Sequence, residues 1–155
     1  METKVDILLA TYKTNIEYLK KQIDSILNQT FENIKLIISD DNSNEPKLKE
    51  TLEEYAKKDK RIELYFQEKN LGYIKNFEFL LKKSTAEYIM FSDHDDIWYP
   101  NKVEESLKEI ELTGTDLVYV NSKQIDGNGK VIHKDYFKYK NMPLISGKSK
   151  LAISR

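Results

Sequence analysis

Two acidic clusters are the residues of this sequence best suited to binding a ligand or doing chemistry. Asp40 and Asp41 follow one apolar run, and Asp93, Asp95 and Asp96 follow another. Like charges a few ångström apart repel, so such clusters are costly unless a positive group holds them. Asp93 and Asp95 have alternate spacing, so both side chains can point to a common side of an extended backbone. Their oxygen atoms are the hard ligands that Mg²⁺ or Mn²⁺ prefers, and the second cluster therefore predicts a divalent-cation site.

The second cluster also has a simpler interpretation that involves no metal. It could be a solvated acidic turn in which Asp96 caps the following helix, and the spacing alone leaves both interpretations open. His94, inside the cluster, could be a ligand, but a histidine among carboxylates is as often a solvated surface group. His133 has still less around it that suggests a metal site.

The composition excludes several classes of protein. The chain has 155 residues, 33% of them charged, and a formal net charge of -1, which is typical of a globular protein and excludes a polybasic nucleic-acid binder. It has no cysteine, so disulfides, thiolate zinc sites and a cysteine nucleophile are excluded. The apolar stretch at residues 7–10 is too short for a signal peptide or a membrane span, and we expect a cytoplasmic protein.

Common catalytic motifs are also missing. The sequence has neither a glycine-rich phosphate loop that ends in Lys and Ser or Thr nor the three spaced glycines of a dinucleotide site. No nucleophile elbow or Ser/His/Asp arrangement can be read from it, so acyl transfer has little support.

Hydrophobic periodicity predicts that strands and helices alternate along the chain. Short apolar runs predict buried strands at residues 5–10, 34–39, 62–66, 88–91 and 117–120. Between them, apolar residues at helical spacing predict helices. The first has a capping box from Thr14 to Glu17 and ends near Asn28, the second begins at Pro46, the third spans residues 74–81, and the fourth follows Pro100.

The last part of the chain is less regular. A turn at residues 126–129 predicts a hairpin appended to the sheet, and no clear period follows Asp135. Alternating strands and helices imply right-handed crossovers and a mainly parallel sheet with helices on both faces. We therefore expect one α/β domain over residues 1–155. Ligands of such sheets bind outside the carboxyl ends of the strands, where both acidic clusters should share one crevice.

Five motifs occur in an order that resembles the family 2 glycosyltransferases, which use nucleotide sugars and have the Rossmann-like GT-A fold. They are Ala10-Thr11-Tyr12, residues 25–31 (SILNQTF), residues 39–43 (SDDNS), Asn70-Leu71-Gly72 with Asn76, and residues 92–98 (SDHDDIW) with Pro100. The resemblance covers residues 4 to about 125. The SDHDDIW form is similar to the subgroup described as rhamnosyltransferase-like.

The resemblance implies roles for particular residues. Thr11 and Tyr12 would line the pocket for the base, and Asp40 would accept a hydrogen bond from a pyrimidine ring. Asp93 and Asp95 would form the Asp-x-Asp motif. Asp95 would bind Mn²⁺ or Mg²⁺ directly, and Asp93 would act nearer the ribose or through water.

Other residues have weaker implied roles. Asp41 and Asp96 would orient the site or cap a helix. Lys75 could meet the diphosphate, or it could be a solvated helix lysine. Trp98 could shape the donor pocket, although a buried tryptophan under the loop is the commoner use.

The implied activity is metal-dependent, inverting transfer of a sugar from a UDP- or dTDP-sugar to a saccharide or lipid-linked acceptor. This would serve the synthesis of a cell-surface polysaccharide, with peripheral association at the inner face of the membrane. Because relatives continue well beyond 200 residues, we expect a truncated domain whose acceptor half is largely absent and whose general base lies beyond Arg155. Asp135 is the late acidic residue, but nothing around it supports that role.

Two alternatives belong to other functional classes. The chain could be a non-catalytic module that binds a nucleoside diphosphate. A haloacid-dehalogenase-type phosphatase is the second, because Asp93-His94-Asp95 approaches its Asp-x-Asp motif. However, Ile97 replaces the expected threonine or valine, and that motif normally follows the first strand rather than the fourth.

Overall fold

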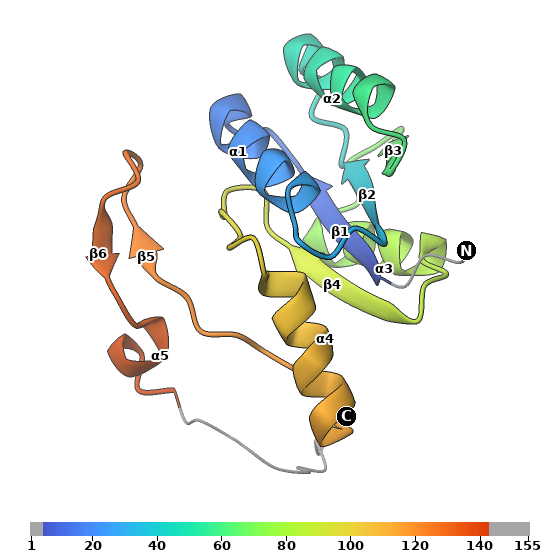
Figure 1. Cartoon of the computed structure of the whole chain (residues 1–155). Coiled ribbons are helices and arrows are strands. Elements are labelled where there is room, and N and C mark those ends of the chain that lie inside the picture. Colours follow the sequence, from blue (N-terminus) through green and yellow to red (C-terminus); the bar gives the residue numbers. More distant parts are fainter. Residues whose placement is uncertain (1–4, 143–155) are drawn as a thin grey trace. The chain divides into compact units, whose positions relative to one another are not determined.

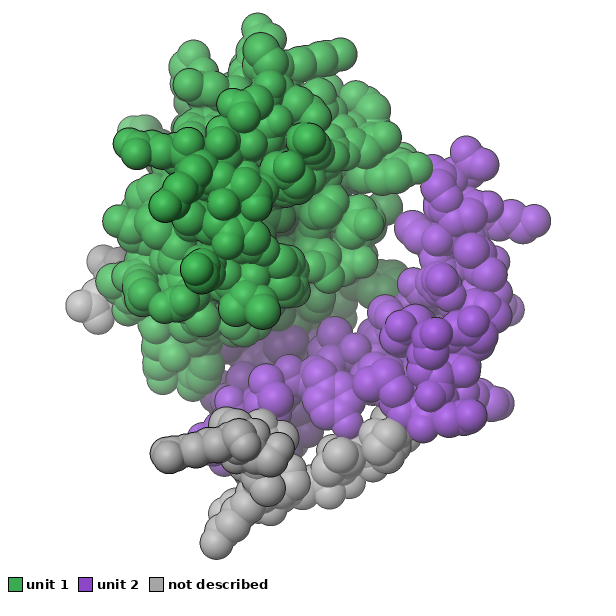
Figure 2. Space-filling model, turned by 180° about the vertical axis from the view of Figure 1, so that it is seen from behind, with its two compact units in different colours: residues 1–102 green, residues 103–155 purple. Residues whose placement is uncertain are grey.

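The computed structural model describes residues 5–142. The chain divides into two compact units, residues 1–102 and residues 103–155, which have different colours in Figure 2. The single domain over residues 1–155 stays a prediction. Within the described residues, no helix is both long and apolar enough to cross a membrane.

Unit 1 alternates strands and helices as the periodicity predicts (Figure 1). Its strands are β1 (Val5–Thr11), β2 (Ile34–Asp40), β3 (Ile62–Phe66) and β4 (Tyr88–Ser92). Its helices are α1 (Ile16–Leu27), α2 (Pro46–Lys58) and α3 (Tyr73–Lys83). These strands and helices confirm the corresponding elements expected from the sequence.

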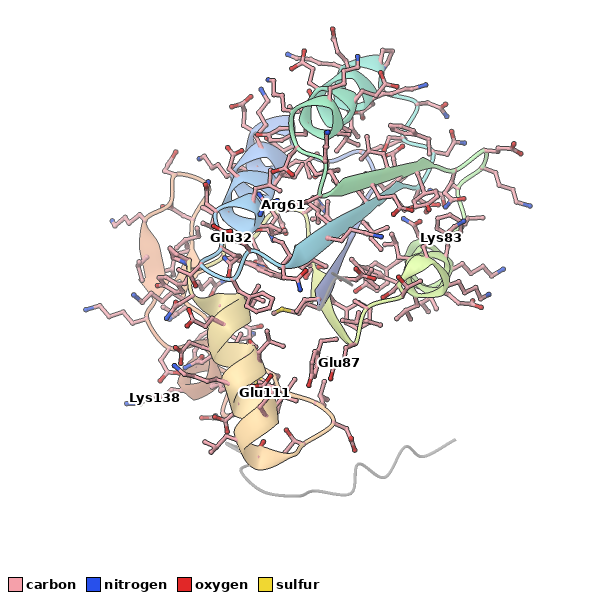
Figure 3. The ribbon with its side chains drawn as sticks, turned by 45° about the vertical axis from the view of Figure 1, so that its right-hand side comes forward. Glu32, Arg61, Lys83, Glu87, Glu111 and Lys138 are labelled. Carbon is pink, nitrogen blue, oxygen red and sulfur yellow. The ribbon has the colours of Figure 1, made fainter. Side chains whose placement is uncertain are left out.

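The strands of unit 1 form one parallel sheet in the order β3-β2-β1-β4. The chain therefore moves outward from β1 to β3 and then crosses to the other side of β1 to form β4. Right-handed crossovers place α1 and α2 on one face and α3 on the other. In Figure 3, α1 and α3 lie on opposite sides of the strands. The direction reverses between β1 and β4, and ligands of such sheets bind at this point, outside the carboxyl ends.

The core of unit 1 lies around β1 and β2. Each strand has a fully buried apolar run, at residues 7–9 and 36–38, as expected for central strands covered on both faces. From α1, Leu19, Ile23 and Ile26 are buried at spacings of four and three residues, so one stripe of this helix faces the core.

The predicted capping box at Thr14 is wrong. Helix α1 begins at Ile16, and its cap is Asn15, whose Oδ1 accepts hydrogen bonds from the backbone N–H groups of Glu17 (2.9 Å) and Tyr18 (3.2 Å). Asparagine caps a helix as well as threonine does, and here it is the residue that directly precedes the first turn.

Unit 2 contains most of α4 (Lys102–Thr113), then β5 (Gln124–Ile125), β6 (Val131–His133) and α5 (Tyr136–Tyr139). Helix α4 and the antiparallel hairpin confirm the predictions. The hairpin forms its own two-stranded sheet, so its predicted attachment to the main sheet is wrong among the described residues. The short α5 lies where no periodicity was visible.

The fifth strand predicted at residues 117–120 is also wrong, because the structure has irregular backbone there. A strand needs a neighbouring strand for its backbone N–H and C=O groups, and none of the strands described pairs with this segment. Apolar composition alone therefore misled the prediction at this position.

Candidate functional site

The carboxyl edge of the sheet brings the two acidic clusters to the same side of unit 1. Strand β1 lies between β2 and β4, with Thr11 in register with Asp40 and Leu9 in register with Ser92. Neighbouring strands are about 4.8 Å apart, so the ends of β2 and β4 are separated by roughly 10 Å. The loops after these strands therefore flank the end of β1.

Asp40 is buried and held by three hydrogen bonds. Its Oδ1 accepts from the Thr11 hydroxyl (2.9 Å) and the Ser43 hydroxyl (2.5 Å), and its Oδ2 accepts from the Ser43 N–H (2.9 Å). A carboxylate has about four acceptor positions. One position on Oδ2 thus remains for another donor, and the orientation of that position is fixed by the protein.

Asp41 is also buried, but its carboxylate faces a different partner. Its Oδ1 accepts from the Leu71 N–H (2.7 Å), its Oδ2 accepts from the Gly72 N–H (2.9 Å), and Asn70 donates to its backbone carbonyl (3.1 Å). Gly72 has φ +81°, a conformation that glycine adopts without a steric penalty. Asp41 therefore fixes the loop that leads into α3.

The loop after β1 is hydrogen-bonded to the loop after β2. The Lys13 N–H donates to the Ser43 hydroxyl (2.9 Å), and Lys13 and Asn42 both have positive φ angles, 46° and 59°. Tyr12 stands out from this turn with 45% of its surface exposed, and the Lys13 ammonium lies 5.3 Å from the centre of its ring. Tyr12 therefore has an exposed ring beside the end of β1.

A buried polar network attaches α3 to β2. Asn76 accepts from the Ser39 hydroxyl (2.6 Å) and donates to the Ser39 carbonyl (3.1 Å), and Gln67 donates to the same hydroxyl (3.0 Å). Lys75, the neighbour of Asn76, is exposed. The structure thus places Lys75 near the start of α3, just after the loop that Asp41 holds.

The loop after β4 presents its carboxylates differently. Asp93 and Asp95 are exposed. Partial burial of the Asp96 carboxyl and the nearby charge of Asp93 raise the pKa of Asp96, while Lys102 opposes this rise. Burial lowers the pKa of Lys102, whose ammonium lies 3.8 Å from the centre of the Trp98 ring. The structure therefore leaves the two Asp-x-Asp carboxylates accessible to a ligand.

The donor set fits one mode of divalent-cation binding. Within residues 5–142, no three or more acidic, histidine or cysteine side chains gather closely enough to enclose a metal ion. The protein can instead offer the carboxylates of Asp93 and Asp95. Mg²⁺ is usually bound by one or two carboxylates, with substrate phosphates and water completing its shell. The arrangement fits a cation that binds together with a diphosphate.

Trp98 is buried, with 5% of its surface exposed, which agrees with packing beneath the loop. Its indole N–H donates to the side-chain oxygen of Gln22 at 3.0 Å. Our sequence reasoning missed Gln22. A signal was present, because Gln22 is a polar residue within the apolar stripe formed by Leu19, Ile23 and Ile26.

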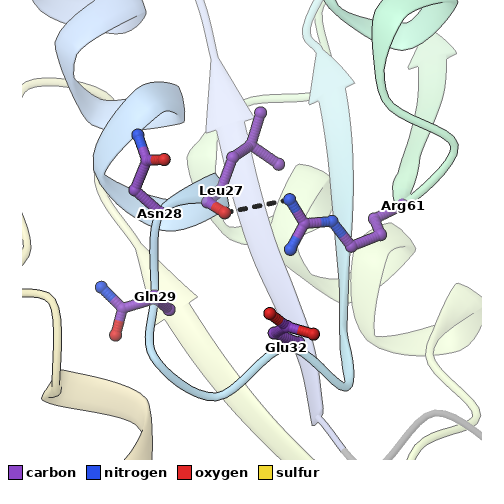
Figure 4. A pocket seen from close by; sticks show the side chains of 5 residues that line it. All are labelled: Leu27, Asn28, Gln29, Glu32 and Arg61. Carbon is purple, nitrogen blue, oxygen red and sulfur yellow. Dashed lines mark hydrogen bonds between the residues drawn. The ribbon is translucent and has the colours of Figure 1, made fainter.

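An open pocket of about 450 Å³ lies at the opposite, amino edge of the sheet (Figure 4). The Arg61 guanidinium reaches from the start of β3 to the Leu27 carbonyl at 2.9 Å, and it also pairs with Asp59 at 2.8 Å. Glu32 lies near it in the same pocket. Arg61 thus links α1 to the start of β3, far from the acidic clusters.

The chain is similar to known proteins over most of its length. Residues 6–152 match the model of glycosyl transferase family 2. The chain is 33% identical over 153 residues to an uncharacterized glycosyltransferase of Methanocaldococcus jannaschii, covering 96% of this chain and 53% of that protein. It is 36% identical over 131 residues to one of Rickettsia bellii, covering 84% of this chain and 18% of that protein. The chain therefore spans about half or less of the length of these relatives.

Solved structures share the fold. S. aureus TarS 1-349 in complex with UDP superposes on 79% of this chain and 38% of its own, with a TM-score of 0.64 and 22% identity. The mannosyltransferase PcManGT from Pyrobaculum calidifontis, in complex with GDP-Man and Mn²⁺, covers 71% of this chain and 33% of its own, with a TM-score of 0.63 and 16% identity. At these identities the likeness shows a shared α/β fold and nothing more specific.

Proposed function

The chain belongs to glycosyl transferase family 2 and has the GT-A type of α/β fold, and from this premise we propose that its carboxyl edge binds a nucleotide-sugar donor with Mn²⁺ or Mg²⁺. The observation that carries the proposal is the placement of the two acidic loops on either side of the end of β1. One loop presents a fixed acceptor, and the other presents two exposed carboxylates.

The base of the nucleotide binds on the β2 side. The open acceptor position of Asp40 takes the ring N–H of a pyrimidine, and Thr11 holds the Asp40 carboxylate in place. The exposed ring of Tyr12 supplies a surface on which the base stacks. Asp41 acts on this side by fixing the loop at residues 70–72 rather than by touching the nucleotide.

The diphosphate binds on the β4 side. Asp95 is a direct ligand of the cation, and Asp93 acts through water or at the ribose. Lys75, exposed near the start of α3, reaches toward the diphosphate as a second positive charge. When bound, the cation stabilises negative charge on the departing diphosphate.

The reaction is transfer of the sugar with inversion at the carbon that leaves the diphosphate. A general base must then deprotonate an acceptor hydroxyl on the opposite face of the sugar. Among the described residues we assign no such base. The acceptor is a saccharide or a lipid-linked saccharide, and the pathway is the assembly of a cell-surface polysaccharide near the membrane.

The comparisons support a nucleotide-sugar donor but leave the base open. TarS has been solved with UDP and with UDP-GlcNAc, and the mannosyltransferase with GDP-Man. The SDHDDIW motif favours a dTDP-sugar through its likeness to the rhamnosyltransferase-like subgroup. Membership of family 2 removes the reason to consider a haloacid-dehalogenase-type phosphatase.

Calorimetry with UDP, dTDP and GDP, each with and without Mn²⁺, tests the proposal. We expect a pyrimidine nucleotide to bind, and to bind more tightly with Mn²⁺. No binding of UDP or dTDP at millimolar concentration, with or without the metal, would reject a pyrimidine donor site.

A pair of variants tests the assignment of the metal ligand. Asp95→Asn should remove the gain in affinity that Mn²⁺ gives. Asp116→Asn makes the same chemical change at an exposed aspartate of unit 2 and should leave that gain intact. An equal loss in both variants would point to a general effect of charge rather than a ligand at Asp95.

A further inference from the structure

Gln22 of α1 connects both ends of the segment that carries the Asp-x-Asp motif. The residue is fully buried. Its amide orientation follows from its partners: the nitrogen donates to the Asp96 carbonyl, and the oxygen accepts from the Trp98 indole at 3.0 Å. The Ser92 hydroxyl lies 2.5 Å from the same amide. One buried side chain therefore fixes the residues on either side of positions 93–95.

Three residues that follow Gln22 in the chain contact the same loop farther along, at residues 98–100. The Ser25 hydroxyl accepts from the Trp98 N–H (3.0 Å), Gln29 donates to the Tyr99 carbonyl (2.8 Å), and the Thr30 N–H donates to the Pro100 carbonyl (2.8 Å). We name Gln22, Ser25, Gln29 and Thr30 the α1 clamp. Most of its partners are main-chain atoms, so it fixes the path of the loop itself.

The clamp leaves the two carboxylates outside its contacts. Gln22 and Gln29 are buried, whereas Asp93 and Asp95 are exposed. A fixed backbone with accessible carboxylates is the arrangement that lowers the cost of binding a cation, because the ligands need little ordering when it arrives. Partners behind metal ligands commonly set their geometry in this way.

We propose that Gln22 is a positioning residue that sets the separation of the Asp93 and Asp95 carboxylates, and thereby the affinity for the divalent cation, without touching it. The inference rests on the proposed function for the identity of the ligand. It adds a residue from a different element, 70 positions away from Ser92, to the residues on which metal binding depends.

Gln22→Met tests the proposal, because methionine has a similar shape and removes every hydrogen bond of the amide. Trp98 is the only tryptophan of the chain, so its fluorescence reports directly on the clamped loop. We expect acrylamide to quench Trp98 more strongly in the variant. Mn²⁺ affinity in the presence of UDP, measured by electron paramagnetic resonance of the free ion, should fall roughly 10- to 100-fold. Affinity for UDP without metal should not change.

Asp6→Asn is the control for a general loss of stability. Asp6 is buried at the amino edge of the sheet, where it accepts hydrogen bonds from Ser84 (2.8 Å) and from the Thr85 N–H (2.9 Å). This variant should unfold more easily but keep the Trp98 quenching and the Mn²⁺ affinity of the unmodified chain. Equal losses of Mn²⁺ affinity in both variants would overturn the proposal.

Two further outcomes separate this proposal from the proposed function. If the unmodified chain takes up no Mn²⁺ with any nucleotide tested, the proposed metal site and the role of Gln22 both fail. If it does, and Gln22→Met binds Mn²⁺ equally well, only the positioning role is overturned. Should Gln22→Met fail to fold, Ser25→Ala decides, because loss of its bond to Trp98 should weaken Mn²⁺ binding in the same direction.

Discussion

The two acidic loops of the carboxyl edge use the same residue type in opposite ways. Asp40 and Asp41 are buried, and the protein itself supplies the donors for their oxygen atoms. Asp93 and Asp95 are exposed, and what the protein holds firmly is the backbone on either side of them.

This difference separates two kinds of recognition. A buried carboxylate with internal partners is a rigid acceptor, suited to one directed hydrogen bond from an uncharged ring. Exposed carboxylates on a fixed backbone repel one another until a cation arrives. The burial of a carboxylate should therefore predict whether its removal damages the fold or only the binding of metal.

The largest effect on stability is expected at Asp41. Asp41→Ala leaves the Leu71 and Gly72 N–H groups without their partner, and hydrogen bonds to a charged group are worth about 1.5–3 kcal/mol each. The free energy of unfolding, from urea denaturation, should fall by about 3 kcal/mol. Glu87→Ala, at an exposed glutamate, serves as the control, and a loss no greater than in this control would break the comparison.

Asp40→Ala should have the next largest effect and should act on both stability and binding. Thr11 and Ser43 lose a buried acceptor, so we expect a loss on the order of 1–3 kcal/mol in the free energy of unfolding. UDP affinity should weaken by the same factor with and without Mn²⁺. A loss that appears only with Mn²⁺ would move Asp40 to the metal side of the site.

Asp59, at the amino edge, is partly exposed, so its burial is intermediate between that of Asp41 and that of Asp95. Hydrogen bonds from Arg61 hold its pKa below the usual value, so this pair stabilises the fold above the unfolded-state pKa of about 3.9 and the stabilisation is lost as the pH falls. Since both side chains are partly exposed, Asp59→Asn should cost about 1 kcal/mol or less at pH 7. Denaturation at several pH values should show the difference between the two proteins shrinking progressively as the pH falls below about 4. A difference that stays constant as the pH falls below 4 would contradict an ionic origin.

The smallest effect on stability is expected at Asp95. Asp95→Asn should change the free energy of unfolding by no more than about 0.5 kcal/mol, because the side chain is exposed. Thermal denaturation with and without Mn²⁺ and UDP measures this together with the stabilisation that the ligands give. A large loss of stability without ligands would show that Asp95 has a structural partner and would erase the contrast with Asp41.

The amino-acid sequence alone determined the frame of the site. Apolar runs and helical spacing gave the strands and helices of unit 1, because burial on one or both faces leaves a local periodic pattern. The alternation implied a parallel sheet, and this implied that residues after β2 and β4 meet at one edge. The ordered motifs identified the family before any contact was known.

Local pattern was insufficient where a feature depends on a distant partner. Residues 117–120 have the composition of a strand, but a strand forms only when another strand pairs with it. The cap of α1 depended on a shift of one residue, from Thr14 to Asn15, that a motif search cannot resolve.

Only the tertiary structure decided which polar side chains hold distant segments of the chain in place. Asp41 looks like Asp40 in the sequence, yet it holds a loop 30 residues away, and Gln22 contacts a serine 70 residues away. A hydrogen bond forms wherever the fold brings a donor to an acceptor, and the order of strands in the sheet determines which distant segments meet. Periodicity reports that a residue is buried, but the partner that makes its burial tolerable is set by the assembled fold.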